Sequence, residues 1–345
     1  MNSSDSYVLF RTPHDSTYTY LRQKSTPRTF HSIADVPLDG GYVIAPFCIC
    51  SDTPIILVEP DDISTHSIRL PQPSPITTKS FHTDEAAERT AYAQAFSHIK
   101  ALLNEPSHPV QKVVLSRRLH YTDLSSQEST ELFLKACHYR PASYVVLWHT
   151  PQTGSWLVAT PEPLLEYDHH QWHTVALAGT LPYVEDEEPR WNKKNKEEQA
   201  IVVRFIEEQL TPLATEITSS PTFTLTTGNL QHLCTDFSFS LREGTDVRHV
   251  ISRLHPTPAV CGLPREEALQ AILDNEHGGR RYYAGFSGPL NLQGQTHLYV
   301  SLRCMQFSTS EATLYAGGGI MPQSIEQEEW DETRRKLMTM RELLV

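Results

Sequence analysis

The stretch Lys112-Val-Val-Leu-Ser-Arg-Arg-Leu119 alternates between apolar and polar side chains. Positions 113, 115 and 119 are apolar, whereas positions 112, 116 and 118 are polar. A period of two is typical of a β-strand, because successive side chains point to opposite faces of a sheet. The pattern therefore predicts a strand that carries Lys112 on the face opposite Val113 and Leu115.

Strand-like runs of this kind occur along the whole chain, with only a few helical segments between them. The other predicted strands are 7–10, 41–50, 55–58, 144–149, 155–160, 173–179, 222–226, 232–241, 282–290, 297–307 and 313–316. Helices are predicted from a cap at Thr83 to Leu103, and at about 128–138, 193–210, 264–276 and 325–344. Many adjacent strands with few helices indicate an α+β fold, with large, mostly antiparallel sheets and helices packed outside.

A proline-rich segment, Leu70-Pro-Gln-Pro-Ser-Pro75, separates the first strands from the rest of the chain. Proline cannot continue a helix or a central strand, so this segment is predicted to be a connector. We therefore divide the chain into an N-terminal part, residues 1–80, and a main region, residues 81–345.

The composition excludes several classes of function. The 345 residues carry a formal net charge of −12, which argues against broad nucleic-acid binding and against docking on anionic membranes. No apolar run approaches the ~20 residues of a membrane span, and the N-terminus lacks a signal-peptide pattern. The six cysteines are scattered, as expected of reduced thiols in a cytoplasmic protein.

Two residues are candidates for acid–base chemistry. Lys112 is either a solvated lysine at a strand end or, if shielded from water, an amine that can act as a base. Glu162 stands between Pro161 and Pro163, which fix the backbone where a strand ends. Its carboxyl is either an ordinary turn glutamate or a rigidly held general acid.

The helix predicted at 193–210 places a carboxylate on its apolar face. Glu198, Ile201, Val202 and Phe205 follow the spacing i, i+3, i+4 and i+7, whereas Glu197 is rotated toward solvent. An inward carboxylate must be compensated, because burying it without a partner is very costly. Glu198 is therefore predicted either to pair with an Arg or Lys or to serve as a metal ligand or catalytic group.

The last predicted helix carries Glu329, Glu332 and Lys336 on one side. Glu332 and Lys336 can form an ordinary surface pair. Alternatively, Glu332 and Glu198 can together hold Mg²⁺, which prefers carboxylates, waters and an anionic substrate. The preceding segment Ala316-Gly-Gly-Gly319-Ile320 lets backbone N–H groups approach an anion closely.

Several of these segments, in this order, resemble the chorismate-binding enzymes, a family of isochorismate, salicylate, anthranilate and aminodeoxychorismate synthases. The resemblance covers roughly residues 105–345 and implies a fold like that of anthranilate synthase component I. It rests on Lys112–Arg117, Thr160–Leu165, Ala176–Thr180, Leu254–Gly262, Tyr283–Gly288, Ala316–Ile320 and Glu329–Thr333 with Lys336.

The resemblance also implies which nucleophile is used. Family members that add water have a lysine at the position of Lys112, whereas anthranilate synthases typically have glutamine there. Aminodeoxychorismate synthases often carry a nucleophilic lysine at the position that is Ala178 here, and Ala259 resembles the isochorismate and salicylate branch. The family pattern thus favours isochorismate synthase over the aminating enzymes.

Further roles follow from the resemblance alone. Lys112 would activate water for attack on C2 of chorismate, and Glu162 would protonate the departing C4 hydroxyl. Mg²⁺ would be the cofactor. The remaining implied roles are metal binding by Glu198, Glu332 and Glu329, and substrate binding by Gly179, His232, Ala259, Arg303, Gly317, Gly318 and Lys336.

Other functions remain open at this point. A salicylate synthase would add pyruvate elimination at the same site, and a non-catalytic chorismate-binding protein is also possible. We expect chorismate as the only small-molecule partner, no nucleic acid, membrane or glutaminase subunit, and a monomer or weak homodimer. The sequence does not decide between menaquinone and siderophore biosynthesis.

Overall fold

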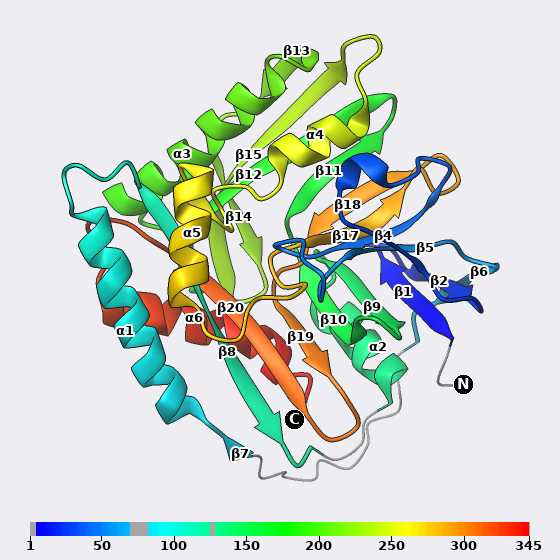
Figure 1. Cartoon of the computed structure of the whole chain (residues 1–345), viewed down its shortest axis with the longest axis horizontal. Coiled ribbons are helices and arrows are strands. Elements are labelled where there is room, and N and C mark those ends of the chain that lie inside the picture. Colours follow the sequence, from blue (N-terminus) through cyan, green and yellow to red (C-terminus); the bar gives the residue numbers. More distant parts are fainter. Residues whose placement is uncertain (1–4, 70–81, 125–127, 345) are drawn as a thin grey trace.

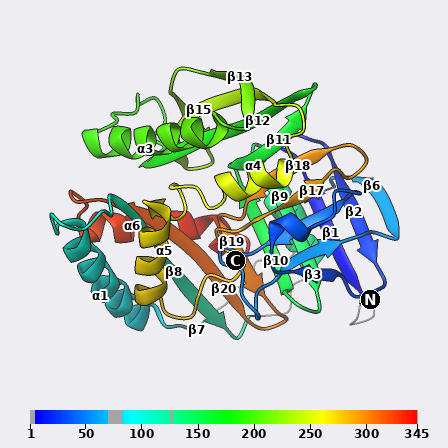
Figure 2. The ribbon, with the colours of Figure 1, turned by 45° about the horizontal axis from the view of Figure 1, so that its top comes forward.

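The computed structural model describes residues 5–69, 82–124 and 128–344. Within these ranges, the strands form two ten-stranded sheets in which every pairing is antiparallel, as predicted. Figure 1 shows the two sheets with helices along their outer faces, and Figure 2 shows the layer of β12, β13 and β15 above the layer of β8 and β20.

The first sheet has the strand order β16-β8-β20-β19-β10-β9-β1-β2-β6, with β7 paired to β8. Its strands are β1 (Ser6–Arg11), β2 (Thr17–Gln23), β6 (Asp62–Ser67), β7 (His82–Thr83), β8 (Lys112–Thr122), β9 (Tyr144–Thr150), β10 (Gly154–Thr160), β16 (Gly262–Leu263), β19 (Cys304–Phe307) and β20 (Ala312–Ile320).

The second sheet has the order β13-β15-β12-β11-β18-β17-β4-β5-β3, with β14 paired to β15. Its strands are β3 (Arg28–Phe30), β4 (Gly41–Ala45), β5 (Ile55–Val58), β11 (Pro163–Asp168), β12 (Gln171–Pro182), β13 (Ala214–Ser219), β14 (Phe223–Thr227), β15 (Leu230–Leu241), β17 (Phe286–Leu290) and β18 (Thr296–Val300).

The helices pack against the strands that carry the candidate residues, α3 against β12 and α6 against β20. None of the helices in the described ranges is long and apolar enough to cross a membrane. The helices are α1 (Glu85–Leu103), α2 (Ser129–Tyr139), α3 (Lys193–Leu210), α4 (Val247–Leu254), α5 (Arg265–Asn275) and α6 (Glu326–Arg341), with a short 3₁₀ turn, η1, at Ile33–Asp35.

Strand β8 is buried on both faces over its first half. Val113 and Leu115 belong to the apolar core between the elements, and Lys112 has no exposed surface. The alternative of a solvated lysine at a strand end is therefore wrong. Other parts of the protein cover both faces of this part of the strand. The polar face that carries Lys112 is therefore shielded from solvent.

Most predicted elements lie where the pattern placed them, but three details differ. Thr83 belongs to β7 and Asp84 is the residue that precedes α1, so the predicted Thr83 cap is wrong. Helix α4 was not predicted, nor were strands β2, β3, β6, β7, β11, β13 and β16. The single strand predicted at 297–307 is broken between β18 and β19, where Arg303 has a φ of +47°.

The N-terminal residues contribute to both sheets. Strands β1, β2 and β6 extend the first sheet, and β3, β4 and β5 extend the second. The predicted connector Leu70–Pro75 lies outside the described residues. The division at residue 80 stays a prediction, although the described strands on its N-terminal side are integral to the same two sheets.

Candidate active site

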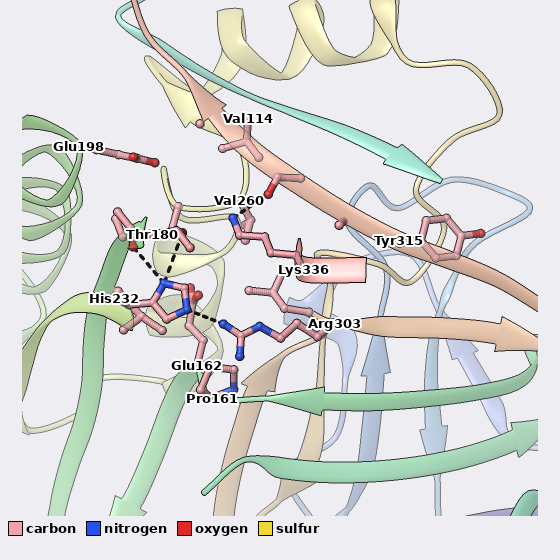
Figure 3. A pocket seen from close by; sticks show the side chains of 18 of the residues that line it. Val114, Pro161, Glu162, Thr180, Glu198, His232, Val260, Arg303, Tyr315 and Lys336 are labelled. Carbon is pink, nitrogen blue, oxygen red and sulfur yellow. Dashed lines mark hydrogen bonds between the residues drawn. The ribbon is translucent and has the colours of Figure 1, made fainter. Parts of the chain in front are cut away.

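A polar pocket lies where the two sheets come together. Its walls come from β8, β12, β15 and β20, from helices α3 and α6, and from the segments that precede β11 and β19. The predicted residues that line it are Glu162, Ala178, Gly179, Glu198, His232, Ala259, Arg303, Gly317 and Lys336. Figure 3 shows charged and polar side chains entering this pocket from several elements.

Glu162 lies in the short link between β10 and β11, and its backbone is held on both sides. Its N–H donates to Thr160 Oγ1 at 3.2 Å, and its carbonyl accepts from the Val300 N–H at 2.9 Å. Burial raises the pKa of the Glu162 carboxyl to about 7, although Lys112, Arg303 and Lys336 act in the opposite direction. A plain turn glutamate would be exposed, so that alternative is wrong. The carboxyl is suited to donate a proton near neutral pH.

Arg303 and His232 form a connected pair on the floor of the pocket. Arg303 Nη2 donates to His232 Nε2 at 2.5 Å, and Arg303 Nη1 donates to Thr227 Oγ1 at 2.9 Å. Burial, followed by Arg303 and Lys336, lowers the pKa of His232 well below its usual value. His232 is therefore neutral, with Nδ1–H donating to the Gly179 carbonyl at 2.9 Å.

Gly179 allows this last contact through its backbone conformation. Its φ is +70°, and the pairing of β12 with β15 shifts register between Ala178 and Leu181. A residue with a Cβ is strained at such an angle. The irregularity turns the Gly179 carbonyl toward His232 and brings the backbone to the pocket wall.

Lys112 and Glu198 form an ion pair behind the glycine segment of β20. The Lys112 Nζ lies 2.9 Å from Glu198 Oε1, and both side chains are buried. Burial acts against ionisation of Glu198, but the amines of Lys112 and Lys194 outweigh it and lower the Glu198 pKa. The helical-face prediction for Glu198 is confirmed, since Glu198 is buried whereas the side chain of Glu197 on the same helix is 45% exposed.

Gly319 is required for this arrangement. A Cβ at that position would lie 2.3 Å from Glu198 Oε1 and 2.7 Å from Lys112 Cε. A Cβ at Gly318 would lie 3.3 Å from Glu329 Oε2 and 3.6 Å from Glu332 Oε1. A side chain at Gly319 would therefore collide with Glu198, and one at Gly318 would crowd Glu329 and Glu332.

Each of the three carboxylates is paired with a lysine. Glu329 Oε1 lies 2.5 Å from Lys194 Nζ, and Glu332 Oε1 lies 2.8 Å from Lys336 Nζ. Lys336 also donates to the Gly317 carbonyl at 2.8 Å. Glu332 and Lys336 are therefore mostly buried components of the site rather than an exposed surface pair.

The carboxylate group fits a hard divalent cation in two respects. All three donors are carboxylate oxygens, the ligands that Mg²⁺ prefers. Glu329 Oε2 is buried, forms no hydrogen bond within the part of the chain that the structure describes, and faces the space beside Gly318. Within the described ranges, no three His, Cys, Asp or Glu side chains are already arranged around a common point as a metal site. In this structure each of the three carboxylates instead pairs with a lysine.

Sequence reasoning missed two polar residues of the site. Lys194 precedes Glu198 by four residues, and this spacing on one helix face could have identified it. Thr227 has no such signal, because its contact with Arg303 joins distant parts of the chain. The predicted roles of all the site residues stay predictions, although the structure brings these residues together.

Comparison with known proteins agrees with this arrangement. A family model described as chorismate binding enzyme matches residues 58–345. Isochorismate synthase EntC of Escherichia coli (strain K12) is 32% identical over 265 residues, which cover 73% of this chain and 66% of that protein. The match thus spans just under two thirds of the length of that relative.

Two solved structures share the fold. MenF, the menaquinone-specific isochorismate synthase from Escherichia coli, has a TM-score of 0.81 at 22% identity, covering 99% of this chain and 89% of that one. Anthranilate synthase component I from Streptococcus pneumoniae TIGR4 has a TM-score of 0.72 at 15% identity, covering 99% and 92%. The predicted anthranilate synthase component I-like fold is confirmed, and this chain belongs to the family of chorismate-binding enzymes.

Proposed function

We propose that this protein is an isochorismate synthase that converts chorismate to isochorismate with Mg²⁺ as its cofactor. One observation carries the proposal: Glu162, a buried carboxyl with a pKa of about 7, lines the polar pocket, and the buried amine of Lys112 is paired with Glu198 in the wall of the same pocket. Addition of water with loss of a hydroxyl needs one group that accepts a proton and one that donates a proton. The similarity to isochorismate synthase EntC supports the same reaction.

Glu162 is the proposed acid. With a pKa of about 7 it is still protonated in a large share of molecules near neutral pH, and no hydrogen bond to another side chain occupies its carboxyl within the described contacts. It can therefore protonate the C4 hydroxyl of chorismate as that group departs. Its backbone contacts fix its direction, so little reorganisation is needed at the moment of proton transfer.

Lys112 is the proposed base that takes a proton from water as the water attacks C2. In the described structure its Nζ is paired with Glu198 Oε1, which itself faces the pocket. The proposed role requires this ion pair to open, so that the amine can lose its proton. The segment of β20 at Gly319 gives the amine and the substrate room to approach each other.

The positive groups of the pocket would hold the two carboxylates of chorismate. Arg303 and Lys336 both line it, and the backbone around Gly317 and Gly318 lies beside Lys336. Arg303 is oriented by Thr227 and His232, which leaves its charge fixed at the pocket floor. Arg–carboxylate contacts are strong and directional, so this residue would set the substrate's orientation.

Glu198, Glu329 and Glu332 would hold Mg²⁺, which when bound would neutralise the charge of a substrate carboxylate. Glu162 and Glu198 line the pocket, and Glu329 and Glu332 lie beside Gly318, so an anionic substrate needs such compensation. The proposed nucleophile is water, and the reaction therefore needs no glutaminase subunit.

The test is to incubate the purified protein with chorismate and MgCl₂ and to identify products by NMR. We expect isochorismate. Unchanged chorismate, in a preparation whose substrate is converted by a control enzyme, would contradict the proposal. Release of pyruvate without any added lyase would instead assign a salicylate synthase.

A further inference from the structure

The three ion pairs of the carboxylate cluster are not equivalent. Lys112 has no exposed surface and lies on a buried strand, and Lys336 is also bound to the Gly317 carbonyl. Lys194 lies in the first turn of α3, its side chain is 16% exposed, and its one hydrogen bond among the described contacts goes to Glu329. Of the three lysines, Lys194 is therefore the one with both a route to solvent and a single anchor.

Lys194 is also the cation most closely tied to all three carboxylates. Burial acts against its charge, but Glu198, Glu329 and Glu332 together outweigh burial and raise its pKa. Its Nζ donates to Glu329 Oε1, while Glu329 Oε2 is buried and accepts no hydrogen bond from any described residue. The Lys194 ammonium thus already compensates the negative charge of a carboxylate that a divalent cation would otherwise bind.

The charge balance of the cluster shows why the position of Lys194 matters for metal binding. Three lysines face three glutamates, so the cluster carries no surplus of negative charge while every ion pair is closed. A divalent cation is attracted to carboxylates whose charge is not already compensated. One ammonium must therefore withdraw before the cluster can bind such a cation well.

We propose that Lys194 is a resident counter-cation of the carboxylate cluster, which a divalent metal ion displaces when it binds Glu329. The lysine keeps the buried carboxylate compensated when metal is absent and weakens metal binding by competing for the same oxygen. This inference rests on the metal site of the proposed function.

The test is metal binding by the full chain without any chorismate. MnCl₂ is titrated and free Mn²⁺ is measured by electron paramagnetic resonance, since Mn²⁺ takes the same oxygen ligands as Mg²⁺. Removing the ammonium with Lys194→Met should tighten binding by about tenfold or more. Lys193→Met is the matched control, because Lys193 neighbours Lys194 but its side chain is 91% exposed and pairs with Glu197. The control should bind like the unsubstituted protein.

Two further variants keep the test decisive. Lys194→Arg retains the positive charge and should keep the weak Mn²⁺ binding. Lys194→Gln removes the charge and should bind Mn²⁺ as tightly as Lys194→Met. If circular dichroism shows that Lys194→Met does not fold, Lys194→Gln takes its place in the test. Equal or weaker Mn²⁺ binding in the neutral variants would overturn the inference. So would an absence of binding in every variant, which would also remove the metal site. Isochorismate formation, measured separately, decides whether the proposed reaction itself fails.

Discussion

Replacing Glu162 with glutamine should make the protein more stable at alkaline pH while it removes the proposed acid. The side chain is 4% exposed, and burial raises its pKa from 4.5 to about 7. The folded protein therefore binds this proton more tightly than the unfolded chain does. Its stability must fall as pH rises between these two values, because the unfolded chain releases the proton there while the folded protein still holds it.

The magnitude follows from the size of the shift. Each pKa unit corresponds to about 1.4 kcal/mol, so ionising Glu162 costs the folded state roughly 3 kcal/mol by pH 8. Glutamine has nearly the same shape and does not ionise. The free energy of unfolding of Glu162→Gln should therefore exceed that of the parent protein by about 3 kcal/mol at pH 8, and by less than about 1 kcal/mol at pH 5.

The assay is urea unfolding followed by tryptophan fluorescence at several pH values between 5 and 8. Glu243→Gln is a suitable control, because Glu243 is an exposed acid whose replacement should not alter the pH dependence. A stability difference that does not change with pH would refute the reasoning, as would a glutamine variant that is less stable at pH 8. Either result would mean that Glu162 is not a buried acid with a raised pKa.

The remaining predictions concern catalysis. The value of kcat/KM should fall as pH rises above about 7, because Glu162 must be protonated to act, and a rate that rises through this range would exclude it as the acid. Lys112→Ala should lower kcat by about 10²-fold or more with the circular dichroism spectrum retained, and undiminished turnover would exclude Lys112 as the base. Gly319→Ala should lower activity by a similar factor, because its Cβ would lie 2.3 Å from Glu198 Oε1; normal activity would mean that the ion pair can shift freely. Treatment with EDTA should abolish isochorismate formation and added MgCl₂ should restore it, whereas activity that persists in EDTA would argue against a metal requirement.

Local patterns predicted the elements of the fold well where one period extended over many residues. The amphipathic spacing of α3 predicted both its bounds and the inward direction of Glu198. The alternation in β8 correctly separated Lys112 from Val113, but it could not show that both faces are covered. Burial of the face that carries Lys112 depends on Glu198 of α3, which is far away in the sequence.

The contacts that define the site could not be predicted from local sequence patterns, because they join residues that are distant in the sequence. The pairing of Lys112 with Glu198 joins a strand of one sheet to a helix packed on the other. Arg303 lies in a break between β18 and β19, at a φ of +47°, where the apolar pattern continued without interruption. Helix α4 has only eight residues, too few for its period to stand out. Motif resemblance supplied the site residues that periodicity could not.

The strand order of the first sheet has a consequence for the way this chain is made. Apart from the two-residue strand β7, the hydrogen-bonded neighbours of β8 are β16 and β20, which leave the ribosome long after it. Until Ile320 has been synthesised and can pair with Val113, β8 is an apolar strand with an open edge. Such distant pairing is slow and leaves nascent chains open to aggregation. The first sheet therefore cannot be completed around β8 until the C-terminal strand β20 has been synthesised.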